Sequence, residues 1–289
     1  MQIKYGFQKE WLHFSRTFRF GGIIIAIFSV ALATPLLYKF MIALLEWTEG
    51  QFSAMTAGDV FTQEDIDSLT GMGAMGELFN DASIVYSIAL ADLTATALLI
   101  IMLVLMSPCG GEQKKRATII PSCSGLEFKD YLLPKFVLYP SVVFVTTLIA
   151  GIVTGILCDA MFTEGHIGVS SILLNSFICA VYEAFILCIY MCLGLCMSRP
   201  GIATIIIYFG QNLVNIILMN LGLTRFHPFT LYNLISSATI KEGNDISAET
   251  ASIIVAVVLA VVISVLMYFI TLAVLGAKKI NNQEDRPEF

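Results

Sequence analysis

The chain has 289 residues, of which 57% are hydrophobic and only 13% are charged, and its mean hydropathy is +0.83. Soluble domains carry about 25% charged residues, so this chain lacks the polar side chains needed to cover a water-facing surface. The composition excludes a soluble enzyme, a nucleic-acid-binding protein and a disordered scaffold, and the formal net charge of -6 does not change this. The sequence therefore predicts an integral membrane protein.

Residues 1–20 precede the first long apolar stretch and are predicted to form an amphipathic helix at the cytosolic membrane surface. Aromatic residues follow one another at steps of four, three and four, which places them on one helical face; they are Phe7, Trp11, Phe14 and Phe18. Such a helix lies in the headgroup plane with its aromatic side toward the lipid. The alternative is a positively charged flank that only orients the first span.

Six apolar stretches are long enough to cross a bilayer core of about 30 Å, which needs roughly 20 apolar residues in a helix. They form a transmembrane domain over 21–276, followed by a tail over 277–289, and their approximate limits are 21–45, 84–106, 135–158, 170–196, 201–222 and 252–276. Helices satisfy every backbone amide within the segment, and the alternating pattern of a membrane β-barrel is absent. The expected fold class is therefore all-α with six transmembrane helices.

The positions of lysine and arginine orient these spans, because basic residues are kept on the cytosolic side. With both termini in the cytosol, thirteen Lys and Arg residues lie inside, two lie outside and Lys39 lies within the first span. The loop over 46–83 holds eight acidic residues and neither Lys nor Arg, so it is placed outside. Both the N-terminus and the C-terminal tail are predicted to be cytoplasmic.

The segment over 107–134, between the second and third spans, reads SPCGGEQKKRATIIPSCSGLEFKDYLLP. A loop that only reverses the chain needs about four or five residues, so this segment is predicted to contact a cytosolic partner. The candidate contact residues are Glu112, Lys114, Lys115, Arg116, Thr118, Pro121, Ser122 and Glu127. The alternative is a solvated loop whose charges only orient the spans.

These parts in this order resemble the permease subunit of type 2 ABC transporters, a six-span exporter membrane domain. In that family the loop after the second span carries an acidic residue, a Gly-Thr pair, a Pro/Ser-rich turn and a lysine that opens the third span. The counterparts here are Glu112, Ala117-Thr118, Pro121-Ser122 with Ser124, and Lys135. Alanine replaces the family's glycine at 117, and Gly125 replaces its basic residue, so the subfamily and the substrate stay open.

The resemblance implies the membrane subunit of an ATP-driven exporter for a hydrophobic or amphipathic substrate, such as a peptide, a drug or a lipid-like molecule. The loop would couple this chain to a separate cytosolic ATPase dimer, and a second permease chain, identical or homologous, would complete the path. ATP and Mg are expected on the partner ATPase, since this chain lacks the G-x-x-x-x-G-K-[ST] phosphate loop, and no cofactor is expected on this chain. The expected location is the plasma membrane of a bacterium, in contact with lipid.

Two acidic residues, Asp92 in the second span and Glu183 in the fourth, lie in the predicted membrane interior. A charge at the bilayer centre costs about 2.5–3.5 kcal/mol on insertion scales, so these residues are candidates for the translocation path. Hydrogen-bonded packing is the alternative role. A proton-coupled secondary transporter that uses both carboxylates is the second functional hypothesis.

Other chemistries find little support in the sequence. Cys188, Cys192 and Cys196 share one face of the fourth span, and thiols can bind Cu(I), but small polarizable residues usually pack there and no metal site is predicted. No H-E-x-x-H or G-x-S-x-G motif occurs, and these are the motifs of common hydrolases. The chain is therefore predicted to be a transport subunit without catalytic residues.

Overall fold

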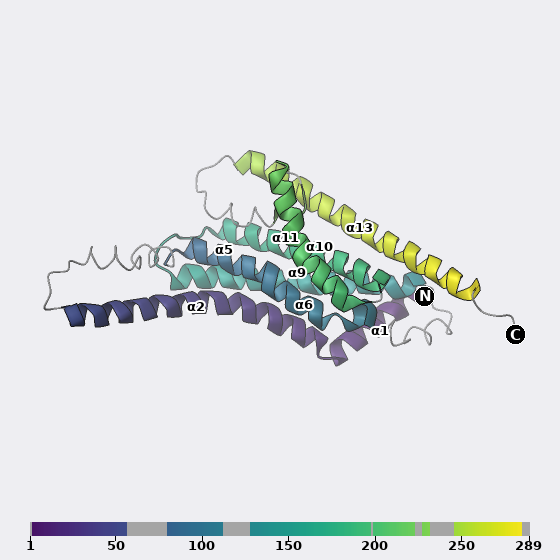
Figure 1. Cartoon of the computed structure of the whole chain (residues 1–289), viewed down its shortest axis with the longest axis horizontal. Coiled ribbons are helices and arrows are strands. Elements are labelled where there is room, and N and C mark those ends of the chain that lie inside the picture. The colour runs from purple at the N-terminus through teal and green to yellow at the C-terminus, as the bar shows by residue number, and fades with distance from the viewer. Residues whose placement is uncertain are drawn as a thin grey trace.

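The structure is a computed structural model that describes residues 2–56, 80–111, 128–197, 199–222, 227–231 and 246–284. Every named element in these residues is a helix (Figure 1). In chain order the elements are α1 (Gln2–Arg16), α2 (Arg19–Thr56), α5 (Ala82–Asp92), the π-helix η1 (Leu93–Ala97), α6 (Leu98–Val104), the π-helix η2 (Ser107–Gly111), α9 (Phe128–Met161), α10 (Val169–Met197), α11 (Pro200–Asn220) and α13 (Ile246–Glu284).

Six of these helical segments are long and apolar enough to span a membrane, which confirms the predicted number and indicates a multi-pass membrane protein. They cover Arg19–Leu44, Ala82–Val104, Lys129–Met161, Val169–Met197, Pro200–Leu218 and Thr250–Ala277. Three helices are longer than predicted. The first continues to Thr56, and the sixth runs from Ile246 to Glu284. The third begins at Phe128, because the amphipathic approach to the third span is itself helical and continuous with it.

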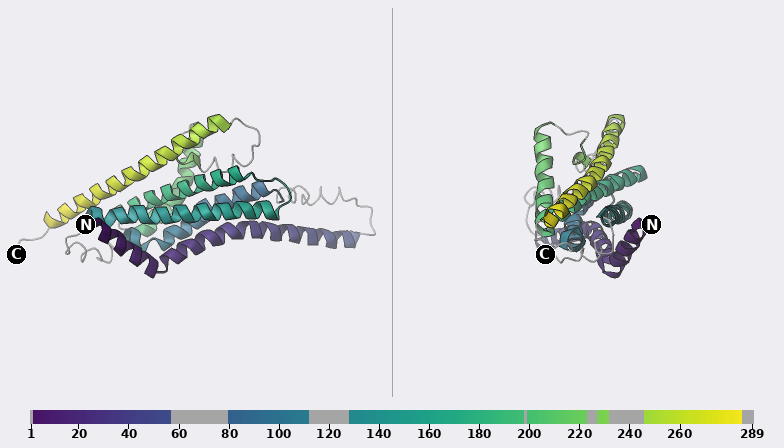
Figure 2. Two further views of the ribbon diagram at one scale, coloured as in Figure 1. Left: turned by 180° about the vertical axis from the view of Figure 1, so that it is seen from behind. Right: turned by 90° about the vertical axis from the view of Figure 1, so that its right-hand side faces the viewer.

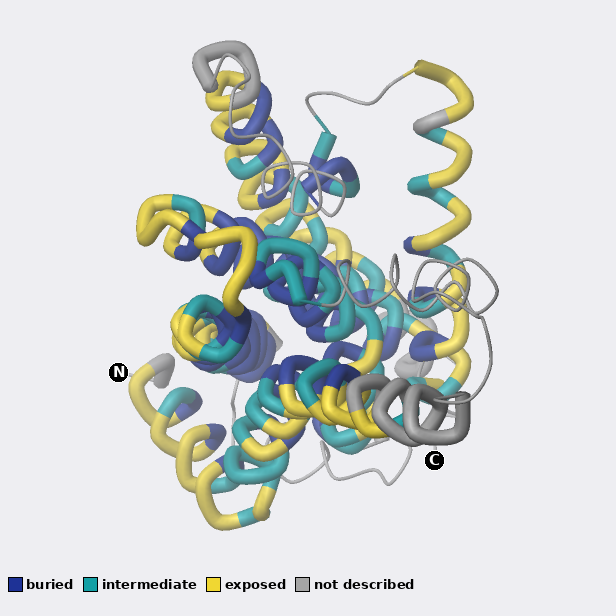
Figure 3. Tube along the Cα trace, turned by 90° about the vertical axis from the view of Figure 1, so that its left-hand side faces the viewer, coloured by how far each residue is buried: buried dark blue, intermediate teal, exposed yellow. Residues whose placement is uncertain are grey.

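Helix α10 lies at the centre of the bundle and packs against α9, α11 and α13. Helix α9 in turn contacts α1, α2 and α5. Helix α13 diverges from the other spans along its length (Figure 1), and burial is concentrated where the central helices meet (Figure 3). Helix α1 and the end of α13 lie at the same end of the molecule (Figure 2), which we call the N-terminal end.

A close helix contact joins α9 to α10 through the G-x-x-x-G pair Gly151 and Gly155. A Cβ atom on Gly151 would lie 2.8 Å from Ser176 Oγ, and one on Gly155 would lie 2.6 Å from Ile172 Cγ2. Both distances are shorter than normal van der Waals contact, so only glycine allows this approach. The pair therefore has the packing role that its spacing indicates.

Helix α2 is tied to α9 where a proline interrupts its backbone hydrogen bonds. Pro35 has no N–H, so it cannot donate to the carbonyl of Ala31 four residues earlier. The hydroxyl of Thr154 on α9 donates to this carbonyl at 3.3 Å. In a membrane a neighbouring hydroxyl commonly satisfies a carbonyl freed in this way, so the contact fixes the first span against the third.

Candidate functional site at the N-terminal end

Helix α1 packs against the first turns of α9 along residues spaced by four. Gly6, Glu10 and Phe14 form its side of this contact, and all three are buried. At Gly6 the helices are so close that a Cβ atom would lie 2.4 Å from the backbone oxygen of Asp130. In an α-helix this oxygen would accept a hydrogen bond from the N–H of residue 134, but Pro134 has no N–H. Helix α1 therefore crosses α9 where the Asp130 carbonyl lacks its helical hydrogen bond.

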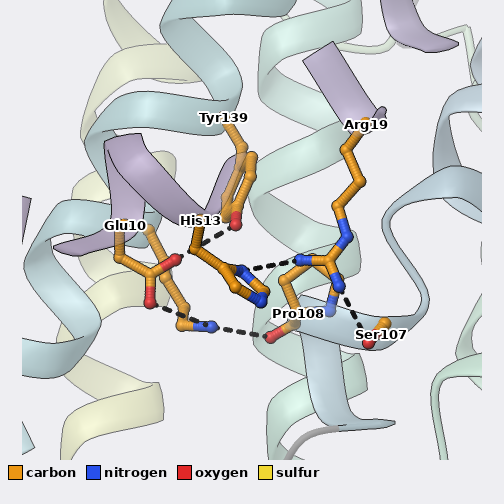
Figure 4. A network of polar contacts seen from close by, with 7 residues as sticks. Glu10, His13, Arg19, Ser107, Pro108 and Tyr139 are labelled. Atoms are coloured by element: carbon orange, nitrogen blue, oxygen red, sulfur yellow. Dashed lines mark hydrogen bonds and ion pairs between the residues drawn. The ribbon is translucent and has the colours of Figure 1, made fainter. Parts of the chain in front are cut away.

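One turn further along, Glu10 of α1 forms a buried ion pair with Lys135 of α9 (Figure 4). Lys135 Nζ lies 3.5 Å from Glu10 Oε1, and the Tyr139 hydroxyl donates to Glu10 Oε2 at 3.1 Å. Lys135 is 0% exposed and Glu10 is 4% exposed. Removing one partner of a buried ion pair leaves the other charge buried and uncompensated, which destabilises the fold. The folded position of Glu10 therefore depends on Lys135, and that of Lys135 depends on Glu10.

The Lys135 ammonium also holds the end of the second span. Its Nζ donates to the backbone carbonyl of Pro108 in η2 at 3.3 Å and lies 4.6 Å from the centre of the Tyr131 ring. An ammonium has three N–H donors, and Glu10, the Pro108 carbonyl and this ring face are three acceptors for them. We call Glu10, Lys135, Tyr139 and the Pro108 carbonyl the α1 clamp, since together they join α1, η2 and α9.

A second contact strengthens the link between the N-terminal segment and η2. Arg19, at the start of α2, donates to Ser107 Oγ at 3.1 Å and lies 3.1 Å from His13 Nδ1. Arginine can only donate hydrogen bonds, so His13 Nδ1 is the acceptor. The side chains of α1, α2 and η2 therefore meet at one point of the N-terminal end (Figure 4).

The predicted coupling loop lies outside the described residues, in the segment over 112–127. It includes Glu112, Lys114, Lys115, Arg116, Thr118, Pro121, Ser122 and Glu127. Both stems of this segment are described, as η2 on one side and the start of α9 on the other. The α1 clamp holds the two stems together, and η2 also packs on α10, where a Cβ atom on Gly194 would lie 2.4 Å from the Cys109 oxygen.

The four aromatic residues predicted to face lipid divide into two groups. Trp11 and Phe18 are 46% and 77% exposed, and Phe7 is half-buried. Phe14 is fully buried, with its ring 5.1 Å from the ring of Tyr139 in an edge-on arrangement. The prediction for Phe14 is therefore wrong, because it lies at the edge of the aromatic face, next to Gly6 and Glu10, where α1 contacts α9.

Sequence reasoning identified Lys135 but missed its partners Glu10 and Tyr139. One signal was present, since Glu10 is the only acidic residue among the first 45. Its spacing of four from both Gly6 and Phe14 places it on a face that carries no other charge. No comparable signal marks Tyr139, which pairs with Glu10 across 129 residues.

The close approach at Gly6 makes this position sensitive to a single methyl group. Replacing Gly6 with alanine gains about 1 kcal/mol of helix propensity, but the added carbon meets a backbone oxygen that cannot rotate away, and such overpacking costs about 1–3 kcal/mol. We expect a net loss of about 1 kcal/mol in thermal unfolding of the purified protein. Gly210→Ala is the control, since a Cβ atom there meets nothing within 4 Å and should stabilise. Equal effects of both substitutions would contradict the docking of α1.

Glu183 lies fully buried in α10 with one hydrogen-bond partner. The Thr147 hydroxyl of α9 donates to Glu183 Oε2, whereas Oε1 has no partner among the described residues. A buried polar atom without a partner is uncommon in proteins. Asn175, two turns earlier on α10, is also buried with neither amide atom paired among the described residues.

Asp92 is half-buried and receives a hydrogen bond of 2.8 Å from the Thr34 hydroxyl of α2. It immediately precedes the π-helix η1, and single π-turns inside α-helices often occur at functional sites. Within the described part of the chain, Asp92 and Glu183 have different hydrogen-bond partners, Thr34 and Thr147. The structure therefore places the two acids beside threonines of different spans rather than in one shared site.

Of the three cysteines that share one face of α10, Cys188 and Cys192 contact α13. Cys188 interacts with Ser264, and Cys192 interacts with Thr271 and with Cys196. The described residues contain no group of three or more His, Cys, Asp or Glu side chains that could hold a metal ion. These contacts are those of packed side chains between two spans.

In comparisons with protein-family models, with curated proteins and with solved structures, nothing matches this chain.

Proposed function

We propose that this chain is the permease subunit of an ATP-driven exporter of the type 2 ABC class. In this proposal it forms part of the path for a hydrophobic or amphipathic substrate, with a second permease chain, and a separate cytosolic ATPase supplies the energy. The six apolar helices and the N-terminal helix agree with the topology of that class. The orientation with both termini inside follows from the lysine and arginine distribution.

The observation that carries the proposal is the α1 clamp. Lys135 is the counterpart of the lysine that opens the third span in the family, and here its ammonium bonds to Pro108, on the opposite stem of the loop. A loop that only reversed the chain would not need its stems joined by a buried lysine, because burying a charge is costly. A loop that receives force from a partner would need such stems.

The arrangement suggests how movement of the loop would reach the membrane. One stem continues into α9, which packs on α10, and the other follows α6. Because the clamp fixes these stems to α1, displacement of the loop by a closing ATPase dimer would move the second and third spans as one unit. The G-x-x-x-G contact would pass the displacement from α9 to α10.

Co-purification tests this proposal directly. The tagged chain is expressed together with the ATPase encoded beside it, and we expect the two to purify as a complex. The double variant Glu112→Arg/Thr118→Pro should abolish the association, since it reverses a charge and introduces a proline within the predicted coupling loop. Arg199→Glu, at an exposed position between α10 and α11, is the control and should leave the complex intact.

The second hypothesis, a proton-coupled transporter, is favoured by the buried Glu183, whose Oε1 has no partner in the part of the chain that the structure describes. It predicts that the chain alone moves protons or solute in liposomes and that Glu183→Gln abolishes this transport. The exporter proposal predicts no transport by the isolated chain and an intact ATPase complex in Glu183→Gln. Transport by the isolated chain, together with failure to bind any ATPase, would reject the exporter proposal.

A further inference from the structure

A large apolar groove lies between α9, α10 and α13, with a volume of about 590 Å³. Its floor is α10, where Phe185 and Cys188 are 2% and 6% exposed, and its rim on α13 includes Val265 and Phe269, which are 50% and 56% exposed. The groove is therefore open sideways, toward the hydrocarbon that surrounds the spans. Its volume is within the range of about 300–1,000 Å³ that is typical of ligand sites.

The lining of the groove is almost entirely apolar, and its two ends differ in the residues around them. Toward the membrane interior it is bounded by apolar residues such as Phe144 and Ala260. Toward the N-terminal end it reaches Leu133 and the hydroxyl-bearing ring of Tyr268. Lys129 lies four residues before Leu133 on the same face of α9 and is exposed, so this end of the groove adjoins a cation.

The described surface of the N-terminal end is positively charged. The exposed cations there are Lys4, Lys9, Arg16, Lys129 and Arg199. The acids Glu10 of α1 and Asp130 of α9 lie beside these cations, and they are only 4% and 2% exposed. Each of these cations attracts an anionic headgroup that lies close to it at the same level. This end of the molecule therefore favours an anionic lipid over a neutral one.

We infer that the groove holds an acyl chain of an anionic phospholipid, with the phosphate beside Lys129 and Tyr268. An open apolar groove inside a membrane is filled by the most abundant apolar molecule beside it, which is the lipid. A tyrosine at the headgroup level with its ring toward the chain has the usual interfacial position of this residue. The inference depends on the spans and the surface charge and does not require the ATPase.

Fluorescence quenching by brominated lipids tests this inference. The chain has two tryptophans, so the probes are built in Trp11→Phe/Trp47→Phe. Phe269→Trp places a probe in the groove, and Phe209→Trp on α11 is the matched control, since Phe269 and Phe209 are 56% and 61% exposed and Phe209 does not line the groove. Each protein is placed in phosphatidylcholine vesicles with increasing brominated phosphatidylglycerol.

The groove probe should reach half of its maximal quenching at a mole fraction of brominated phosphatidylglycerol about fivefold lower than the control probe. Adding Lys129→Gln should remove this difference, and brominated phosphatidylcholine should quench both probes alike. Identical phosphatidylglycerol curves for the two probes would overturn the inference, because the groove would then exchange freely with bulk lipid. Absence of quenching at 269 would also overturn it and would indicate that protein, such as a second copy, covers the groove.

Discussion

Replacing Lys135 with methionine is expected to lower the free energy of unfolding by about 3–5 kcal/mol, the usual cost of removing one partner of a buried ion pair. Methionine keeps most of the aliphatic length of lysine, so packing changes little. Among the described residues, however, the Glu10 carboxylate would retain only the Tyr139 hydroxyl, and the Pro108 carbonyl would lose the Lys135 donor. Thermal unfolding of the purified protein in detergent measures the loss.

The double variant Glu10→Met/Lys135→Met separates the ion pair from general damage to the fold. Replacing both buried charges by apolar residues of similar volume is often nearly neutral, so most of the lost stability should return. Lys4→Met on the exposed side of α1 is the control and should change stability by less than about 0.5 kcal/mol. If the double variant were as unstable as Lys135→Met, the two charges would not interact in the folded protein.

The six spans could be predicted from the sequence because membrane solvation imposes length and composition on each helix independently. The arrangement of the helices could not be predicted in this way. Helix α10 is central and α13 is peripheral, although α13 has the more apolar window, because in lipid an apolar surface gains little by turning inward. Close contacts such as those with Gly151 and Gly155 of α9 hold α10 in its central position, and they depend on side-chain shape.

The candidate site could be predicted only in part, for a related reason. Lys135 was identified through a resemblance to a known family. The aromatic spacing predicted a helix at α1, and Trp11 and Phe18 are exposed. The face that docks on α9 consists of Gly6, Glu10 and Phe14, so it carries one apolar residue and not an apolar stripe. A glycine that allows close contact and an acid that pairs with a distant lysine have no periodic pattern, so only the folded chain brings them together.

Replacing Thr147 with valine is expected to cost about 2 kcal/mol, since it leaves both carboxyl oxygens of the buried Glu183 without a partner. This exceeds the roughly 0.6 kcal/mol that helix-to-helix hydrogen bonds average in membranes, because the acceptor has no other donor to turn to among the described residues. Valine has the shape of threonine, so the substitution tests the hydroxyl alone. Thermal unfolding again provides the measurement.

The neighbouring threonine supplies a matched control for this substitution. Thr146 is also buried, but its hydroxyl donates to the carbonyl of Val142 in its own helix at 2.8 Å, so Thr146→Val should cost less than about 1 kcal/mol. In the background Glu183→Leu, Thr147→Val should cost almost nothing, since replacing both partners by apolar groups removes the unsatisfied atoms. Equal losses for Thr146→Val and Thr147→Val would show that Glu183 gains no stability from Thr147.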